Sequence, residues 1–102
     1  MIEKVNFSDK FDRFNELWSP KIVATLNDYH LKIAKLEGDF VWHKHDDTDE
    51  VFVVVEGTLH IDCRENGNEY RLTLEKGEMV SVPKGLEHKP YCLLYTSPSP
   101  RD

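Results

Sequence analysis

The residues best suited to chemistry in this chain are two histidines and a glutamate near its middle. His43 and His45 are two positions apart, so on an extended strand both imidazoles leave the same face, with Cα atoms roughly 6.5–7 Å apart. Imidazoles at that separation can share one ion at the ~2.0–2.1 Å typical of metal–nitrogen bonds. The polar loop Asp46–Asp49 turns the chain back, so we expect Glu50 to face the same interior, where the apolar run Val51–Val55 makes an unpaired carboxylate costly to desolvate. A bound cation removes that cost; the alternative is that both histidines are solvated at a polar strand end.

The elements that must position these side chains begin with a short helix. Apolar residues recur at helical spacing near the start of the chain, where Ser8 stands at an N-cap position and Pro20 closes the pattern. This spacing predicts an amphipathic helix over residues 9–18, whose aromatic face packs on a sheet. The residues that carry the pattern are Phe7, Phe11, Phe14, Leu17 and Trp18.

Beyond Pro20, the chain reads as short strands separated by turn residues. Apolar and polar side chains alternate in several of these segments, and Asn66-Gly67 readily supplies the positive φ angles of a type I′ hairpin turn. Strands at spacings of about 8–12 residues, with Gly and Pro between them, are typical of a small all-β sandwich or barrel. We expect strands over residues 22–26, 30–36, 40–45, 51–55, 58–63, 70–74 and 79–82.

Two spaced motifs extend the pattern that begins around His43. The first comprises Gly38, His43-Lys44-His45, Glu50 and Gly57, and the second comprises Gly77, Pro83-Lys84-Gly85 and His88. Over residues 38–88 they resemble the two motifs of the cupin superfamily, with a short linker between them. The chain departs from the family pattern in the spacer after Gly38, which is one residue short. The final Asn of the second motif would fall at position 92, inside the unusual terminal segment, so this position is not compared with the pattern.

The resemblance implies a small single-domain cupin barrel (a double-stranded β-helix or jelly roll) that binds one divalent transition metal. It carries over to His43, His45, Glu50 and His88 as the metal ligands, and to the preceding Pro-x-Gly turn as the device that aims His88. Cupins bind ions such as Fe, Mn, Ni, Co or Zn. Three imidazoles and a carboxylate suit any of these better than Ca or Mg.

The resemblance does not specify the reaction, and the expected lining of the pocket restricts the class of substrate only in part. Strand parity places Val41 and Phe52 on the metal-facing side, so we expect a largely apolar pocket for a small-molecule ligand. A cupin similar to mannose-6-phosphate isomerase would need an inward cation for the phosphate, and the sequence does not orient Lys35, Lys84 or Lys89. We therefore expect a metal-dependent, oxygenase-like enzyme. The alternatives are the sugar-phosphate isomerase-like cupin and a non-catalytic ligand-binding or sensor cupin.

Other conspicuous residues are expected to have structural roles. We expect His30 and His60 to be exposed and Cys63 to be a small core residue. Trp42 alternates with His43, so it should point away from the pocket as a packing or dimer contact. The loop Asp46–Asp49 is expected to be a solvated loop and not a second metal site.

Composition and charge restrict the partners and the compartment. Thirteen basic and 19 acidic residues give a formal net charge of −6, which disfavours nucleic acid and anionic membrane surfaces as partners. There is no apolar run near the ~20 residues of a transmembrane helix, no signal-peptide pattern at the start, and only two cysteines. We expect a cytoplasmic protein. A homodimer is also expected, because a barrel this short leaves strand edges to cover.

The end of the chain has an unusual sequence. Residues 92–102 resemble the in-frame translation of a transposase adapter used to prepare sequencing libraries. We therefore expect a helical segment over residues 1–20, a cupin barrel over 21–91 that is truncated at its C-terminus, and a non-native tail over 92–102. On this interpretation the natural gene continues past Tyr91 with at least one more strand.

Overall fold

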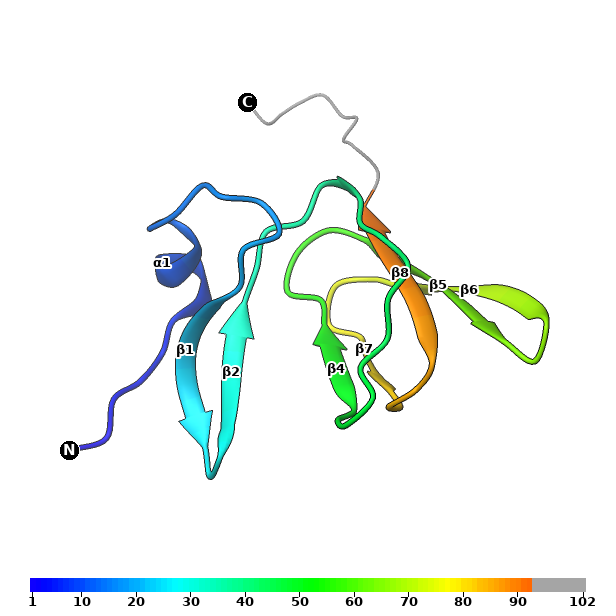
Figure 1. The fold of residues 1–102 in the computed structure, drawn as a ribbon. Helices are drawn as coiled ribbons and strands as arrows, with labels where there is room; N and C mark the ends of the chain where they lie inside the picture. The colour runs from blue at the N-terminus through cyan, green and yellow to red at the C-terminus, as the bar shows by residue number, and fades with distance from the viewer. Residues whose placement is uncertain (93–102) are drawn as a thin grey trace. The chain divides into compact units, whose positions relative to one another are not determined.

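The structure, a computed structural model, describes residues 1–92. These residues form one short helix and eight strands (Figure 1). The chain divides into two compact units, Met1–Leu36 and Glu37–Asp102. The first unit contains α1 (Phe7–Phe11), β1 (Lys21–Leu26) and β2 (Tyr29–Ile33). The second contains β3 (Gly38–Asp39), β4 (Glu50–Val53), β5 (Leu59–Glu65), β6 (Asn68–Leu74), β7 (Met79–Val82) and β8 (Glu87–Cys92).

The N-terminal helix is shorter and begins earlier than the sequence predicted. Its N-cap is Asn6, whose side-chain oxygen accepts a hydrogen bond from the backbone N–H of Asp9 at 2.9 Å, so Ser8 already lies inside the helix. The helix ends at Phe11, and Trp18 adopts a left-handed φ of 56°. The prediction of a helix over 9–18 was wrong because non-local contacts override the spacing: the ammonium of Lys35 donates to the carbonyl of Phe14 at 2.6 Å.

The first unit also contains an antiparallel hairpin of β1 and β2. The hairpin closes between Leu26 and Tyr29, where Asn27 adopts a positive φ. β2 ends at Ile33 and not at residue 36 as predicted, because Lys35 forms an isolated bridge with Leu17 and its carbonyl accepts the N–H of Trp18 at 2.9 Å.

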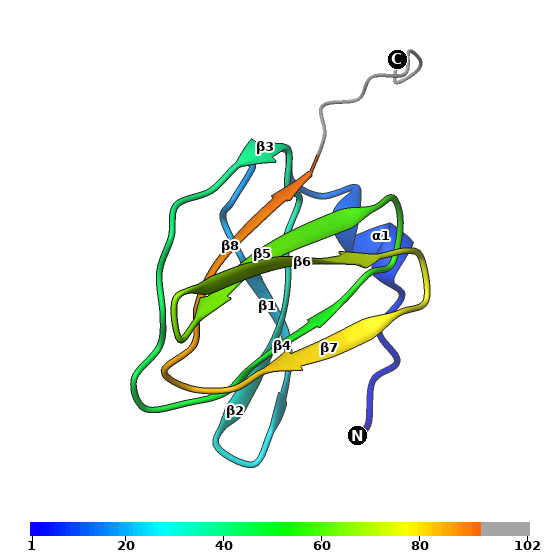
Figure 2. The same cartoon turned by 90° about the vertical axis from the view of Figure 1, so that its right-hand side faces the viewer.

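The second unit contains two sheets. One has the strand order β3-β8-β5-β6 and the other pairs β4 with β7 (Figure 2). β5 and β6 form the predicted hairpin, in which Asn66 and Gly67 both have positive φ, as a type I′ turn requires. Alternate residues of β5 are buried, and Cys63 is a core residue as predicted. The buried apolar side chains of this unit are Val54, Leu59, Ile61, Cys63, Leu74 and Val82.

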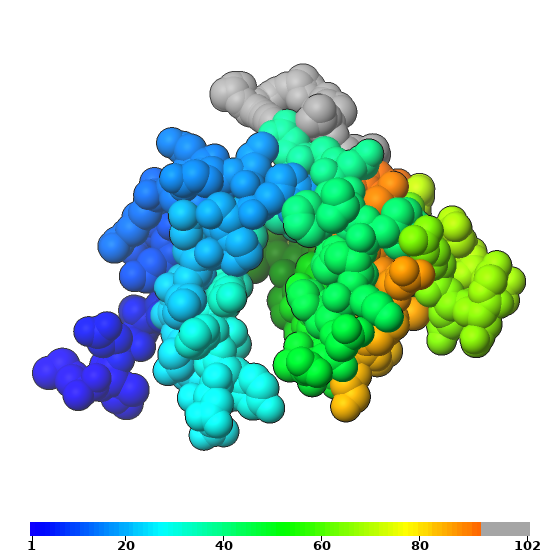
Figure 3. Space-filling view, in the orientation of Figure 1, coloured from blue at the N-terminus to red at the C-terminus, as the bar shows by residue number. Residues whose placement is uncertain are grey.

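The predicted strand over residues 40–45 does not form. Only Gly38 and Asp39 pair continuously with β8, opposite Cys92 and Tyr91, and His43 then makes a single bridge to His88. The pairing stops because Pro90 of the partner strand β8 has no N–H to donate. Pro90 contributes only its carbonyl, which accepts the N–H of Phe40. The green segment before β4 still lies against orange β8 in the space-filling view (Figure 3).

Two sequence expectations concern the ends and the surface of the chain. Cys92 belongs to β8, whereas the rest of the segment interpreted as an adapter translation, residues 93–102, lies outside the described residues. Within residues 1–92, no helix has the length and apolar character needed to cross a membrane.

Candidate metal centre

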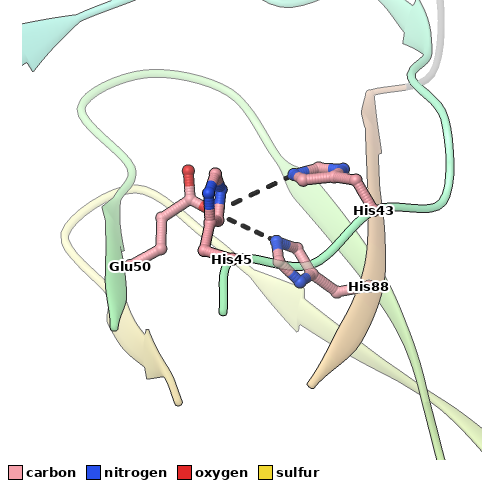
Figure 4. A group of neighbouring side chains, drawn as sticks. All are labelled: His43, His45, Glu50 and His88. Carbon is pink, nitrogen blue, oxygen red and sulfur yellow. Dashed lines mark hydrogen bonds and ion pairs between the residues drawn. The ribbon is translucent and has the colours of Figure 1, made fainter. Parts of the chain in front are cut away.

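Four side chains of the second unit converge on one point (Figure 4). These are His43, His45, Glu50 and His88, whose potential ligand atoms all lie within 4.8 Å of one another. The Oε1 atom of Glu50 lies 3.0 Å from Nε2 of His88, 3.2 Å from Nε2 of His45 and 4.0 Å from Nε2 of His43. The structure therefore brings together all four residues that the sequence predicted as ligands.

Backbone pairing sets the positions of these side chains. His43 and His88 face each other and exchange both backbone hydrogen bonds, at 3.0 and 2.9 Å, so their rings lie with centroids 4.4 Å apart. The carbonyl of His45 accepts the N–H of Gly85 at 2.8 Å. Glu50 is the first residue of β4, where the chain re-enters a sheet after the polar loop. Three separate segments thus contribute to one site.

Two of the imidazoles are oriented by their own backbone. The ring Nδ1 of His43 lies 2.9 Å from the carbonyl oxygen of Val41, and that of His88 lies 2.9 Å from the carbonyl oxygen of Leu86. A carbonyl oxygen can only accept, so Nδ1–H donates in both rings and a neutral ring directs its Nε2 lone pair toward Glu50.

The donor set fits a divalent cation. A lone pair on Nε2 and a carboxylate oxygen at hydrogen-bond distance repel each other unless a proton or a cation lies between them. Three ring nitrogens face the same oxygen of Glu50, and one ion can satisfy all of them at once. Imidazole nitrogen with a single carboxylate suits Fe, Mn, Co, Ni or Zn, and the bond from Nδ1–H to a carbonyl is the usual way to orient a ligating histidine.

Solvent access differs strongly among the four residues. The side chain of His88 is 1% exposed, that of His43 23%, that of Glu50 34% and that of His45 45%. Aromatic rings pack edge-on against the two least exposed imidazoles, Phe52 against His88 at 6.2 Å and Phe40 against His43 at 5.2 Å between centroids. The inner side of the site is therefore apolar, and its outer side is open to water.

Several neighbouring residues differ in role from what the sequence indicated. Val41, expected to face the metal, has an exposed side chain and contributes its carbonyl instead. His60 is half-buried and not exposed, because its ring bonds the Thr73 hydroxyl at 2.9 Å and stacks on Tyr91. Trp42, by contrast, makes a packing contact as expected, because its ring lies beneath the guanidinium of Arg64.

One polar residue near the site has a contact that the sequence analysis missed. Asp49, expected to be a solvated residue, accepts a hydrogen bond from the backbone N–H of Lys84 at 2.9 Å through its Oδ1 atom. The available signal was its position directly before Glu50, combined with a proline in the second motif.

Comparison with known proteins agrees with this architecture. Residues 29–93 match the family model described as a cupin domain. The chain belongs to the cupin family. A cupin-2 domain containing protein from Shewanella frigidimarina has a similar solved structure, with a TM-score of 0.82 and 54% sequence identity, over 87% of this chain and 83% of that one. A Neisseria meningitidis protein gives a TM-score of 0.77 at 32% identity, over 90% of each chain.

The chain matches only part of the length of each of three curated relatives. An uncharacterized Bacillus subtilis protein is 33% identical over 66% of this chain and 57% of its own length. Acireductone dioxygenases from Parvibaculum lavamentivorans and Phaeosphaeria nodorum are 44% and 32% identical, over 45% and 54% of this chain. The matches span 24% and 31% of those two enzymes.

Proposed function

We propose that this cupin binds one divalent transition metal through His43, His45, Glu50 and His88 and is a metal-dependent, dioxygenase-like enzyme for a small molecule. The observation that carries the proposal is the convergence of three Nε2 atoms on one carboxylate oxygen. The similarity to two acireductone dioxygenases over the cupin region supports the oxygenase class.

Each group of the site has a defined task in this proposal. When bound, the metal supplies Lewis-acid chemistry and, in the case of iron, redox chemistry toward dioxygen. Glu50 supplies the negative charge that offsets the cation, and the carbonyls of Val41 and Leu86 hold two imidazoles in the metal-accepting tautomer. Phe40 and Phe52 contribute apolar rings that pack edge-on against His43 and His88.

The isomerase alternative is less well supported by the charges of the described residues. A sugar phosphate needs a cation that faces the site. The ammonium of Lys35 donates to the carbonyl of Phe14, and that of Lys89 lies 5.8 Å from the ring centroid of Trp42. Two of the three lysines that the sequence left open are thus occupied elsewhere.

Metal content and nitric oxide binding test the proposal. The protein is purified from cells for elemental analysis, then loaded anaerobically with Fe(II) and exposed to nitric oxide. We expect about one ion per chain and an electron paramagnetic resonance signal from an iron–nitrosyl complex, which requires an open coordination position. Stoichiometric metal without a nitrosyl signal would favour a non-catalytic binding module.

Two histidine variants locate the ion. His45→Ala is expected to lose most of the metal, whereas His60→Ala removes an imidazole of the same unit outside the cluster and should leave the metal content unchanged. The proposal is refuted if both variants retain the same stoichiometric metal.

We also propose that the protein is a cytoplasmic homodimer. The four-stranded sheet has β3 and β6 at its edges, and a second copy can cover such edges. Sedimentation velocity of the protein should give a dimer, and a monomer across the micromolar range would contradict this.

A further inference from the structure

The loop that precedes Glu50 and the turn that precedes His88 are joined by a hydrogen bond at the point where the β4–β7 ladder ends. β4 pairs with β7 until Glu50 stands opposite Val82 (Figure 2). The residue that follows the end of β7 is Pro83, which has no N–H, so the ladder cannot gain a donor there. The next available donor is the N–H of Lys84, and it bonds to the carboxylate of Asp49 at 2.9 Å.

The segment that donates this hydrogen bond is a tight turn. The N–H of Leu86 donates to the carbonyl of Pro83 at 3.3 Å, and Gly85 has a φ of +84°. A positive φ at the third residue is the mark of a type II turn, and it explains why glycine occupies this position. The internal bond of the turn uses only the last N–H, which leaves those of Lys84 and Gly85 for acceptors outside the turn.

Both outside acceptors belong to the segment that carries the ligands. The Gly85 N–H donates to the carbonyl of His45 at 2.8 Å, and the Lys84 N–H donates to Oδ1 of Asp49. The turn is therefore held between a residue that is itself a candidate ligand and a residue that directly precedes one. His88 follows the turn by two residues and is itself held by backbone pairing with His43 and with Cys63 of β5. The turn therefore links the start of β8 to the residue that precedes Glu50.

We propose that Asp49 is a positioning residue for the metal site: its carboxylate ties the residue before Glu50 to the Pro83–Leu86 turn that leads into β8, and thereby holds Glu50 within reach of His88. This inference rests on the proposed metal-binding function. The bond is exposed, so its loss changes the position of the turn more than the stability of the fold.

Three variants separate the hydrogen bond from the charge. Asp49→Ala removes both, while Asp49→Asn retains a side-chain oxygen that can accept from Lys84. Asp47→Ala removes the same charge from the same loop, and within residues 1–92 the Asp47 carboxylate makes no hydrogen bond or ion pair. Dissociation constants for Co²⁺ are measured by titration of the visible spectrum, and amide hydrogen exchange of Lys84 is followed by NMR on the metal-free proteins.

We expect Asp49→Ala to weaken Co²⁺ binding about 10–100-fold, the usual effect of losing a group that orients metal ligands, with the Lys84 amide exchanging faster. Asp49→Asn should restore both properties, and Asp47→Ala should match the wild type. Equal Co²⁺ affinity in Asp49→Ala and Asp47→Ala, or unchanged exchange of the Lys84 amide, overturns the inference. If the wild type still binds Co²⁺ in that case, the proposed metal site stands. A wild type that binds no Co²⁺ refutes the metal site and this role together.

Discussion

The candidate ligands predict a large, metal-dependent gain in thermal stability. Glu50 and His88 are 38 positions apart and meet only in the folded chain. An ion held by all four ligands therefore binds the native state far more tightly than the unfolded chain. Its contribution to the free energy of unfolding is RT ln(1 + [L]/Kd), or about 2.7 kcal/mol at a free metal concentration of 100 Kd. For a chain of about 100 residues, this raises Tm by roughly 11–22 °C.

The His45→Ala variant turns this expectation into a test. If the loss of one imidazole raises Kd about 100-fold, the same metal concentration equals the new Kd and contributes only about 0.4 kcal/mol. The shift in Tm then falls to roughly 2–3 °C.

The assay is differential scanning fluorimetry of the chelator-treated protein with and without Co²⁺. His60→Ala is the matched control, because this imidazole bonds to Thr73 and lies outside the cluster. If Co²⁺ raised the Tm of wild type and His45→Ala equally, the ion would be stabilising the protein from another place, and the reasoning would be refuted.

Three further predictions concern the scaffold of the second unit. Ile61 is fully buried, so Ile61→Ala should lower the free energy of unfolding, measured by urea denaturation, by about 2–5 kcal/mol. Val51 is exposed, so Val51→Ala should change it by less than about 0.5 kcal/mol. Equal effects of the two substitutions would contradict the burial of Ile61. Burial raises the pKa of the Cys63 thiol, so with the other thiol removed, Ellman's reagent should react only on unfolding, and rapid reaction of the folded protein would contradict this. The hydrogen bond from the Arg71 guanidinium lowers the pKa of Asp62 below its usual value. The stability that this pair contributes is therefore present above about pH 4 and is lost as pH falls through the lowered pKa. A Tm difference between wild type and Asp62→Asn that stays constant from pH 6 to pH 2 would argue against this contribution.

Local patterns in the sequence were sufficient where short-range chemistry decides the structure. Asn66-Gly67 predicted the β5–β6 hairpin because few residue pairs adopt two consecutive positive φ angles. The apolar alternation of β5 predicted the buried face that contains Ile61 and Cys63. Spacing pointed to His43, His45 and Glu50 as candidate ligands, and the resemblance to the two cupin motifs added His88.

The sequence failed where a partner strand or a distant contact decides the structure. The strand expected over 40–45 is interrupted because Pro90, half the chain away, lacks a donor. The aromatic spacing that suggested a longer helix includes Phe14, which is held by Lys35, a residue beyond the end of β2 and 21 positions away. Asp49 was overlooked for the same reason, since its acceptor role depends on a turn 35 positions later.

The unequal exposure of the four candidate ligands gives the site an inner and an outer end. His88 and His43 form the inner end and are fixed by bonds to their own backbone. His45 and Glu50 form the more exposed outer end. An arriving ion meets the outer pair first, and a competing chelator reaches that pair before the inner one. On the proposed function, the outer pair therefore governs how fast an ion enters and leaves, whereas all four ligands together determine how firmly it is held.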